Sequence, residues 1–263
     1  MMEIYIDYAK VLFTTAILLY ASWSDWKTRE VDDKVWILFI ALTLPLTIIQ
    51  ILTTKFFILN LIYSLLLSFT IIFVLCFVLT YIGFFGGADA KSLLCLALAF
   101  PWQPKTIQPL LLKIPPPIFP FSFLTNGLVI FLVVIILVLV KNFLWKIKTG
   151  KKLFEGLEHE SNIKKFLAVF VGFKVKKQKL KETVHYSPME ELRKEKDGRI
   201  KRSFKISSSL TVEKLLENFD YEKLPEEVWV TPRIPMVIFI FLGFLTAIFL
   251  GDFILIFLFN LLF

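Results

Sequence analysis

The sequence contains very few cysteines and histidines, which limits the chemistry open to it. Both cysteines, Cys76 and Cys95, lie inside apolar runs, where a free thiol acts as a small hydrophobic group. A disulfide framework is therefore not expected, and no Cys-x-x-Cys pair is available to bind a metal. The two histidines, His159 and His185, are far apart and have no partners at ligand spacing. We expect neither a metal site nor another cofactor.

Charge is scarce outside one block of the chain. Residues 141–233 hold 22 Lys and Arg against 14 Asp and Glu, so the whole formal charge of +8 comes from this block and the remainder is neutral. A basic block can bind nucleic acid or acidic lipid. The positive-inside bias of membrane proteins explains it more simply as a cytoplasmic domain, and we expect no nucleic-acid partner.

The remaining sequence is too apolar for a soluble domain. Hydrophobic residues make up 57% of the chain, the mean hydropathy is +0.72 and there are 29 Phe, which predicts an integral membrane protein. The apolar runs predict six transmembrane helices, with a soluble domain over 141–231 inserted before the last; the helices span about 4–24, 35–53, 57–82, 88–100, 121–140 and 232–263. Residues 1–140 would form the membrane domain.

The first run lacks the basic n-region and small-residue cleavage site of a secretory signal. We therefore expect it to be retained in the cell (plasma) membrane with its N-terminus outside. Six crossings then place both termini outside, and the loops after the first, third and fifth spans face the cytoplasm. A Pro-rich stretch over 105–120 is expected to form an external loop.

The soluble block is predicted to be small and mostly β. Apolar alternation with β-branched and aromatic residues predicts a strand over 166–175. Asp197-Gly198 is typical of a hairpin turn, with 199–207 as the returning strand. Residues 211–218 are expected to form a short helix.

Two aspartates stand at the ends of membrane helices on the same predicted side. Asp25 closes the first run, and Asp89 lies in Gly-Gly-Ala-Asp-Ala-Lys (86–91) before the short fourth run. An ionised Asp at the centre of a bilayer costs about 2.5–3.5 kcal/mol, so its presence suggests function. Two carboxylates a few Å apart share a proton: one activates a water that attacks a peptide carbonyl, and the other protonates the carbonyl oxygen. This is the chemistry of an aspartic-protease dyad.

Segment 86–91 resembles the second-aspartate motif of the Gly-x-Gly-Asp membrane aspartyl proteases, in the form found in archaeal preflagellin peptidases. Ser-Asp-Trp-Lys-Thr-Arg-Glu-Val (24–31) resembles their first-aspartate segment, and Val-Trp-Val-Thr-Pro-Arg-Ile-Pro (228–235) is similar to the approach to their last span. The resemblance implies a peptidase that removes short basic leaders from preflagellins or other type IV pilin-like precursors, at the cytoplasmic membrane face. It implies Asp25 and Asp89 as the catalytic pair.

The supporting residues that the resemblance brings with it are Gly86, Gly87, Ala88 and Lys91. Ala88 stands where the motif has a Gly directly before the aspartate, a departure that archaeal members also carry. Lys91 would bias the charge of the dyad, hold the loop, or snorkel at the start of a helix. Bacterial relatives that also N-methylate their products carry a Cys-x-x-Cys segment; since none exists here, we expect no methylation.

An acidic group, Glu30, Asp32 and Asp33, follows Asp25 closely. It is either a docking site for a basic leader, through charge pairing, or a solvated loop.

Two other classes of protein compete with the protease. A transporter or ion channel would use the paired Asp as a proton or cation relay, but a relay needs carboxylates near mid-membrane and usually an internal repeat. An assembly factor that presents the basic domain to a partner would leave the two same-side aspartates unexplained.

Overall fold

The computed structural model describes residues 2–54, 58–111, 115–182, 186–194, 200–204 and 225–262. It divides into two compact units. The first contains Met1–Phe131 and Pro235–Phe263, and the second contains Leu132–Ile234. Helix α5 (Phe119–Thr149) begins in the first unit and ends in the second.

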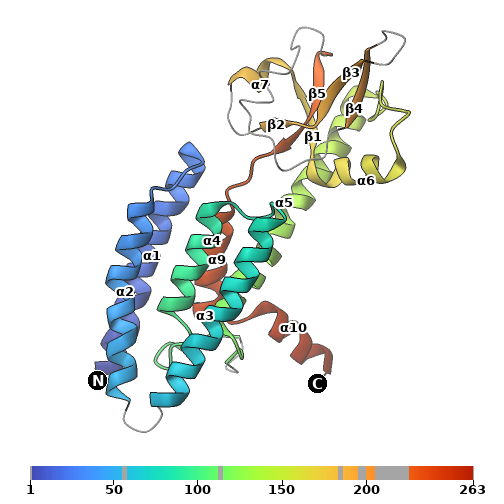
Figure 1. Ribbon diagram of the computed structural model, residues 1–263. Coiled ribbons are helices and arrows are strands. Elements are labelled where there is room, and N and C mark those ends of the chain that lie inside the picture. Colours follow the sequence, from blue (N-terminus) through green and yellow to red (C-terminus); the bar gives the residue numbers. More distant parts are fainter. Residues whose placement is uncertain are drawn as a thin grey trace. The chain divides into compact units, whose positions relative to one another are not determined.

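The first unit is a helical bundle (Figure 1). Its elements are α1 (Met2–Thr28), α2 (Asp33–Thr53), α3 (Ile58–Tyr81), α4 (Gly87–Ala99), the start of α5, α9 (Met236–Phe249) and α10 (Phe253–Leu262). Four described helices, α1, α2, α3 and α5, are long and apolar enough to cross a membrane. The predicted runs over 4–24, 35–53, 57–82 and 121–140 thus lie in membrane-grade helices, and the protein is a multi-pass membrane protein.

Helix α4 lies at the centre of this bundle and contacts α1, α2, α3 and α9. It has only 13 residues, about 20 Å at 1.5 Å per residue, which is too short to cross the hydrocarbon core. Its apolar side chains Leu93, Leu96 and Ala99 are fully buried. The short fourth helix predicted over 88–100 is therefore present, enclosed by protein on several sides.

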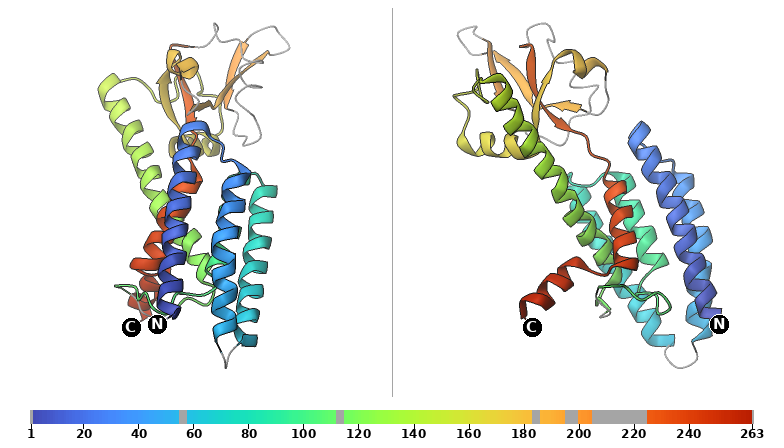
Figure 2. Two further views of the ribbon diagram at one scale, coloured as in Figure 1. Left: turned by 90° about the vertical axis from the view of Figure 1, so that its left-hand side faces the viewer. Right: turned by 180° about the vertical axis from the view of Figure 1, so that it is seen from behind.

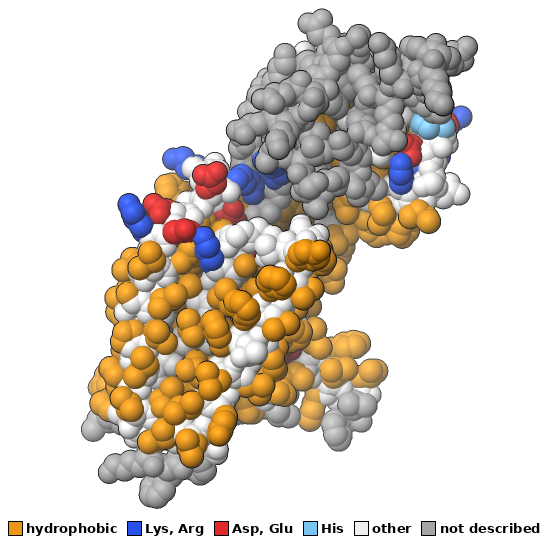
Figure 3. All heavy atoms as spheres, in the orientation of Figure 1, with side chains coloured by type: hydrophobic (Ala, Val, Ile, Leu, Met, Phe, Trp, Pro, Cys, Tyr) orange, Lys and Arg blue, Asp and Glu red, His pale blue; other side chains and the backbone are white. Residues whose placement is uncertain are grey.

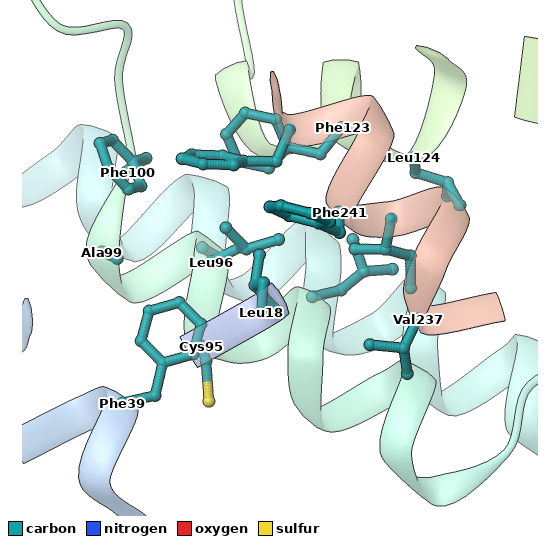
Figure 4. Close-up of a cluster of buried hydrophobic side chains, with 14 of the residues drawn as sticks. Leu18, Phe39, Cys95, Leu96, Ala99, Phe100, Phe123, Leu124, Val237 and Phe241 are labelled. Carbon is teal, nitrogen blue, oxygen red and sulfur yellow. The ribbon is translucent and has the colours of Figure 1, made fainter. Parts of the chain in front are cut away.

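Aromatic rings fill the space between α4, α5 and α9 (Figure 4). Phe100, Phe123 and Phe244 contact one another with ring centroids 5.3–6.5 Å apart. The close approach of α5 and α9 depends on two glycines. A Cβ on Gly243 would lie 2.0 Å from the carbonyl oxygen of Phe123, and one on Gly127 would lie 2.6 Å from that of Phe239. Small residues permit such close helix packing inside membranes.

The helix predicted over 232–263 begins at Met236 and is broken into two helices, α9 and α10. Helices α9 and α10 meet at a bend of 54°, because Gly251 takes φ +111° and Asp252 starts a new helix by accepting hydrogen bonds from the N–H groups of Ile254 and Leu255. Asn126 of α5 holds the break from both sides: its amide donates to the carbonyl oxygen of Gly251 and its oxygen accepts from the N–H of Phe253. If the bent pair is one span, the described helices give five spans, not six.

A buried polar network ties α1 to α2 and to the segment after α4. Lys10 donates to Gln50 (3.0 Å), Gln50 donates to Asp7 (3.0 Å), and the hydroxyl of Thr106 donates to the other oxygen of Asp7 (2.7 Å). The Lys10 ammonium also lies 5.0 Å from the ring centroid of Phe100. Asp7 and Lys10 are 1% and 2% exposed. Sequence reasoning missed this network, because Asp7 and Lys10 lie inside the predicted first span and no local pattern shows which side chains they meet.

The second unit combines the end of α5 with a small α+β fold (Figure 2). Its further elements are α6 (Asn162–Val171), β1 (Phe173–Lys176), α7 (Gln178–Glu182), β2 (Tyr186–Pro188), β3 (Glu190–Lys194), β4 (Ile200–Phe204) and β5 (Glu227–Pro232). One antiparallel sheet has the order β1-β5-β2, with Phe173 opposite Val230, and β3 pairs with β4 in a second sheet.

The strand predicted over 166–175 is wrong in its first part, where α6 runs to Val171. The side chain of Ser161 accepts from the N–H of Lys164 and caps this helix, and its apolar residues follow helical rather than alternating spacing. The predicted return strand over 199–207 corresponds to β4. The turn at Asp197-Gly198 and the helix predicted over 211–218 lie outside the described residues.

Two buried carboxylates hold the second unit together. Glu190 accepts from the N–H of Trp229 (2.8 Å) and pairs with Arg202 (2.7 Å), which joins the two sheets. Glu160 accepts from the N–H of Phe204 (2.8 Å) and pairs with Lys164. Burial acts to raise the pKa of Glu160, but the hydrogen bonds from Lys164 and Phe204 outweigh it and lower that pKa. The carboxylate therefore stays ionised in its partly enclosed position.

Candidate active site

Asp25 lies on the last turns of α1, at the point where this helix ends. The helix stops after Thr28 because Arg29 adopts φ +63°, and the hydroxyls of Ser24 and Thr28 then bind the carbonyl oxygen of Glu30. The Asp25 side chain is 8% exposed. It lies near the backbone N–H of Val237, in the first turn of α9. A helix N-terminus favours negative charge, so α9 stabilises the Asp25 carboxylate.

Asp89 is held in a matching way at the N-terminus of α4. Its Oδ2 accepts from the backbone N–H of Gly86 at 2.8 Å, and its side chain is also 8% exposed. The hydroxyl of Ser92 donates to the Asp89 carbonyl oxygen at 2.7 Å, which fixes the first turn of α4. The carboxylate therefore points back across the helix start.

The two glycines of the motif have different roles. A Cβ on Gly86 would lie 3.3 Å from Asp89 Oδ2, tighter than most real contacts, whereas a Cβ on Gly87 would meet nothing within 4 Å. The left-handed turn that leads into the motif is made earlier, by Gly83 at φ +75°. Gly86 therefore allows the carboxylate to approach the backbone closely. Ala88 is half-buried on α4 and packs against the hydrophobic core.

The fold brings the two aspartates together although 64 positions separate their numbers in the sequence. Both α1 and α4 contact α9 and each other, and α4 and α9 start at the end of the bundle where α1 finishes (Figure 1). The two carboxylates are near enough for their negative charges to repel each other. Two carboxylates in one partly enclosed place, each beside the N-terminus of a different helix, can share a proton.

The acidic group beside Asp25 is exposed, and two of its members have structural partners. Asp32 caps α2 by accepting from the N–H of Lys34 at 2.9 Å. Asp33 forms an ion pair with Lys91, which joins the start of α2 to the start of α4. Of the three roles considered for Lys91, its contact with Asp33 favours holding the loop. Glu30 presents an exposed side chain, and its backbone oxygen accepts from Ser24 and Thr28.

Among the described residues, no group of three or more His, Cys, Asp and Glu side chains is arranged to hold a metal ion. Asp89 is neighboured instead by Cys76, whose thiol donates to the carbonyl oxygen of Ala90.

Comparison with known proteins gives matches along most of the chain. Residues 12–140 match the model of the type IV leader peptidase family. Residues 164–253 match a second model, described as the C-terminus, type II, of archaeal peptidase A24. The chain is also 29% identical over 247 residues to a preflagellin peptidase of Methanococcus maripaludis, an alignment that covers 89% of this chain and 92% of that protein.

The two matches follow one another along the chain and together cover most of it. The chain is therefore similar to the type IV leader peptidase family over most of its length, and to an archaeal preflagellin peptidase.

Proposed function

We propose that this protein is an aspartic endopeptidase that removes the short basic leader from preflagellins or type IV pilin-like precursors at the cytoplasmic face of the cell membrane. Asp25 and Asp89 are its catalytic pair. The observation that carries the proposal is their meeting at one end of the bundle, each beside a helix N-terminus. The match to the type IV leader peptidase family and the similarity to a preflagellin peptidase support the leader substrate.

The mechanism follows from the geometry of the pair. With one proton between the two carboxylates, the ionised one takes a proton from a water molecule as the water attacks the scissile carbonyl. The protonated one donates to the carbonyl oxygen as it gains negative charge. The backbone N–H of Gly86 holds the Asp89 carboxylate in place, and the first turn of α9 at Val237 lies beside Asp25; neither backbone group supplies a proton. Because the two sites are coupled, their titration belongs to the pair.

The direct test is to incubate the detergent-purified protein with a preflagellin and follow the loss of the leader on a gel. We expect a product shorter by the leader alone. An uncut precursor under conditions where the protein remains folded would contradict the proposed function.

The acidic group Glu30, Asp32 and Asp33 is proposed to attract the basic leader, because it lies exposed beside Asp25. Changing Glu30→Gln, Asp32→Asn and Asp33→Asn together should raise KM several-fold and leave kcat nearly unchanged, since exposed charge pairs contribute only about 0.2–1 kcal/mol each. Asn still caps a helix, so α2 should keep its start. The dependence of KM on salt should also become flatter.

The matched control for this triple variant is Glu3→Gln, which removes an exposed acid at the opposite end of α1. It should leave KM unchanged. An unchanged KM in the triple variant at low ionic strength would show that the leader is bound elsewhere.

The orientation of the second unit is a separate prediction. Gln178 is exposed in that unit, and we expect a Gln178→Cys variant to resist a membrane-impermeant maleimide in intact cells but to react after permeabilisation. Lys105→Cys, in the predicted external loop and also exposed, should react in intact cells. Efficient labelling of Gln178→Cys in intact cells would reverse the proposed topology.

A further inference from the structure

Helix α6 in the second unit exposes a continuous apolar stripe. The stripe repeats at the spacing of one helix face; its members are Ile163, Phe166, Leu167, Phe170 and Val171. Ile163 is 74% exposed and Phe166 is 63% exposed. In Figure 3, orange side chains gather over this helix at the margin of the grey region. A water-soluble surface rarely leaves such a cluster uncovered.

The opposite face of α6 is fixed to its own unit. Ala168 is fully buried, and the amide of Asn142 on α5 donates to the carbonyl oxygens of Val169 (2.9 Å) and Gly172 (2.7 Å). These hydrogen bonds fix the C-terminal end of α6 at the level of Asn142 along α5. Figures 1 and 2 show α6 lying across the direction of α5, not along it.

At this level along α5, lysines first appear on its exposed apolar surface, which continues beyond them at Phe143, Leu144 and Ile147. With 31 residues, α5 is about 46 Å long, well beyond a hydrocarbon core of about 30 Å. Its exposed apolar residues in the second unit include Leu132, Val133, Ile136, Leu137 and Val140. The first lysine after them is Lys141, followed by Lys146 and Lys148. Lysines at the end of an apolar span mark the membrane–water interface, and Asn142 lies at this border.

The surroundings of the stripe carry positive charge. Lys146, Lys152 and Lys165 line one hollow beside α6, together with Leu153, Phe154 and Glu158. Lysines beside an apolar helix face are typical of helices that lie in the plane of an anionic membrane surface. A second copy of the protein would cover the apolar residues but would gain nothing from this basic border.

We propose that α6 is an in-plane membrane helix whose apolar stripe enters the headgroup–acyl boundary of the anionic leaflet that α5 reaches at Asn142. The occupant of the exposed stripe is lipid. This contact seats the soluble unit on the bilayer at a fixed height, and it does not depend on the proposed peptidase activity.

The test places a nitroxide spin label on α6 in the full-length protein. Phe166→Cys carries the label in a background with Cys76→Ala and Cys95→Ala, and the protein is reconstituted in vesicles of phosphatidylcholine and phosphatidylglycerol in equal parts. Gln178→Cys, exposed on α7 of the same unit, is the matched control. Power saturation with oxygen, which enters lipid, and with a water-soluble nickel chelate then measures the environment of each label.

We expect the label at 166 to collide with oxygen and to be protected from the nickel chelate, with a ratio of the two several-fold higher than at 178. Equal access of the chelate to both labels would overturn the proposal. Protection of the label at 166 from both reagents would also overturn it, because the stripe would then be buried against protein.

Discussion

Replacing either Asp25 or Asp89 by Asn is expected to abolish leader cleavage, with kcat falling by about 10⁴-fold or more. Residues that act as one catalytic unit show losses of this size, and their single losses are not additive. The double variant should therefore be no worse than either single one. The gel assay with a preflagellin, run at single turnover, measures the loss directly.

The fold should survive these changes. At position 89 an Asn oxygen can still accept the hydrogen bond from the N–H of Gly86, and at both positions Asn has nearly the same size and shape as Asp, so the unfolding temperature should stay near that of the unchanged protein. Asp252→Asn is the matched control. This aspartate caps α10, a role that Asn fills well, and the variant should cleave normally. If either Asp25→Asn or Asp89→Asn cleaved the precursor at the wild-type rate, the proposed aspartic mechanism would be wrong.

Lys10→Met is expected to destabilise the membrane unit by about 1–3 kcal/mol, the usual cost of leaving a buried hydrogen-bonding group without its partner. The change leaves the Gln50 amide oxygen without its donor, and the Asp7 carboxylate, 1% exposed, with Gln50 and Thr106 but no nearby cation. Thermal unfolding in detergent, followed by circular dichroism, measures the loss. Because this network lies at the other end of α1 from Asp25, activity at low temperature should persist in the folded fraction.

A second substitution separates charge from packing. Asp7→Asn combined with Lys10→Met removes both buried charges and keeps an acceptor for Gln50, and replacing buried charges together by well-packed neutral groups often costs no stability. We expect the double variant to recover most of the stability. If Lys10→Met alone unfolds at the same temperature as the unchanged protein, the network contributes nothing to the stability of the fold, and neither does the contact of Lys10 with Phe100.

The sequence predicted the presence of the long apolar helices, but it did not predict the shapes of two elements. Long apolar runs predicted α1, α2, α3 and α5, because nothing but membrane or a very large core can accept them. The bend between α9 and α10 was not predicted, since it depends on Asn126, which reaches Gly251 and Phe253 from another helix. The start of α6 was assigned to a strand because a short apolar run fits both periods; the cap at Ser161 was the signal that distinguishes them.

By itself, the sequence determined the class of this protein and the identity of its two candidate catalytic groups. A carboxylate is so costly beside apolar spans that Asp25 and Asp89 stand out without any structure. Only the tertiary structure decided how they are held: the N-terminus of α9 reaches Asp25, and Gly86 turns its N–H to Asp89. It also decided that Asp7 and Lys10 form a buried network. Hydrogen bonds between residues far apart in the chain depend on how the helices pack, and no local pattern records that packing.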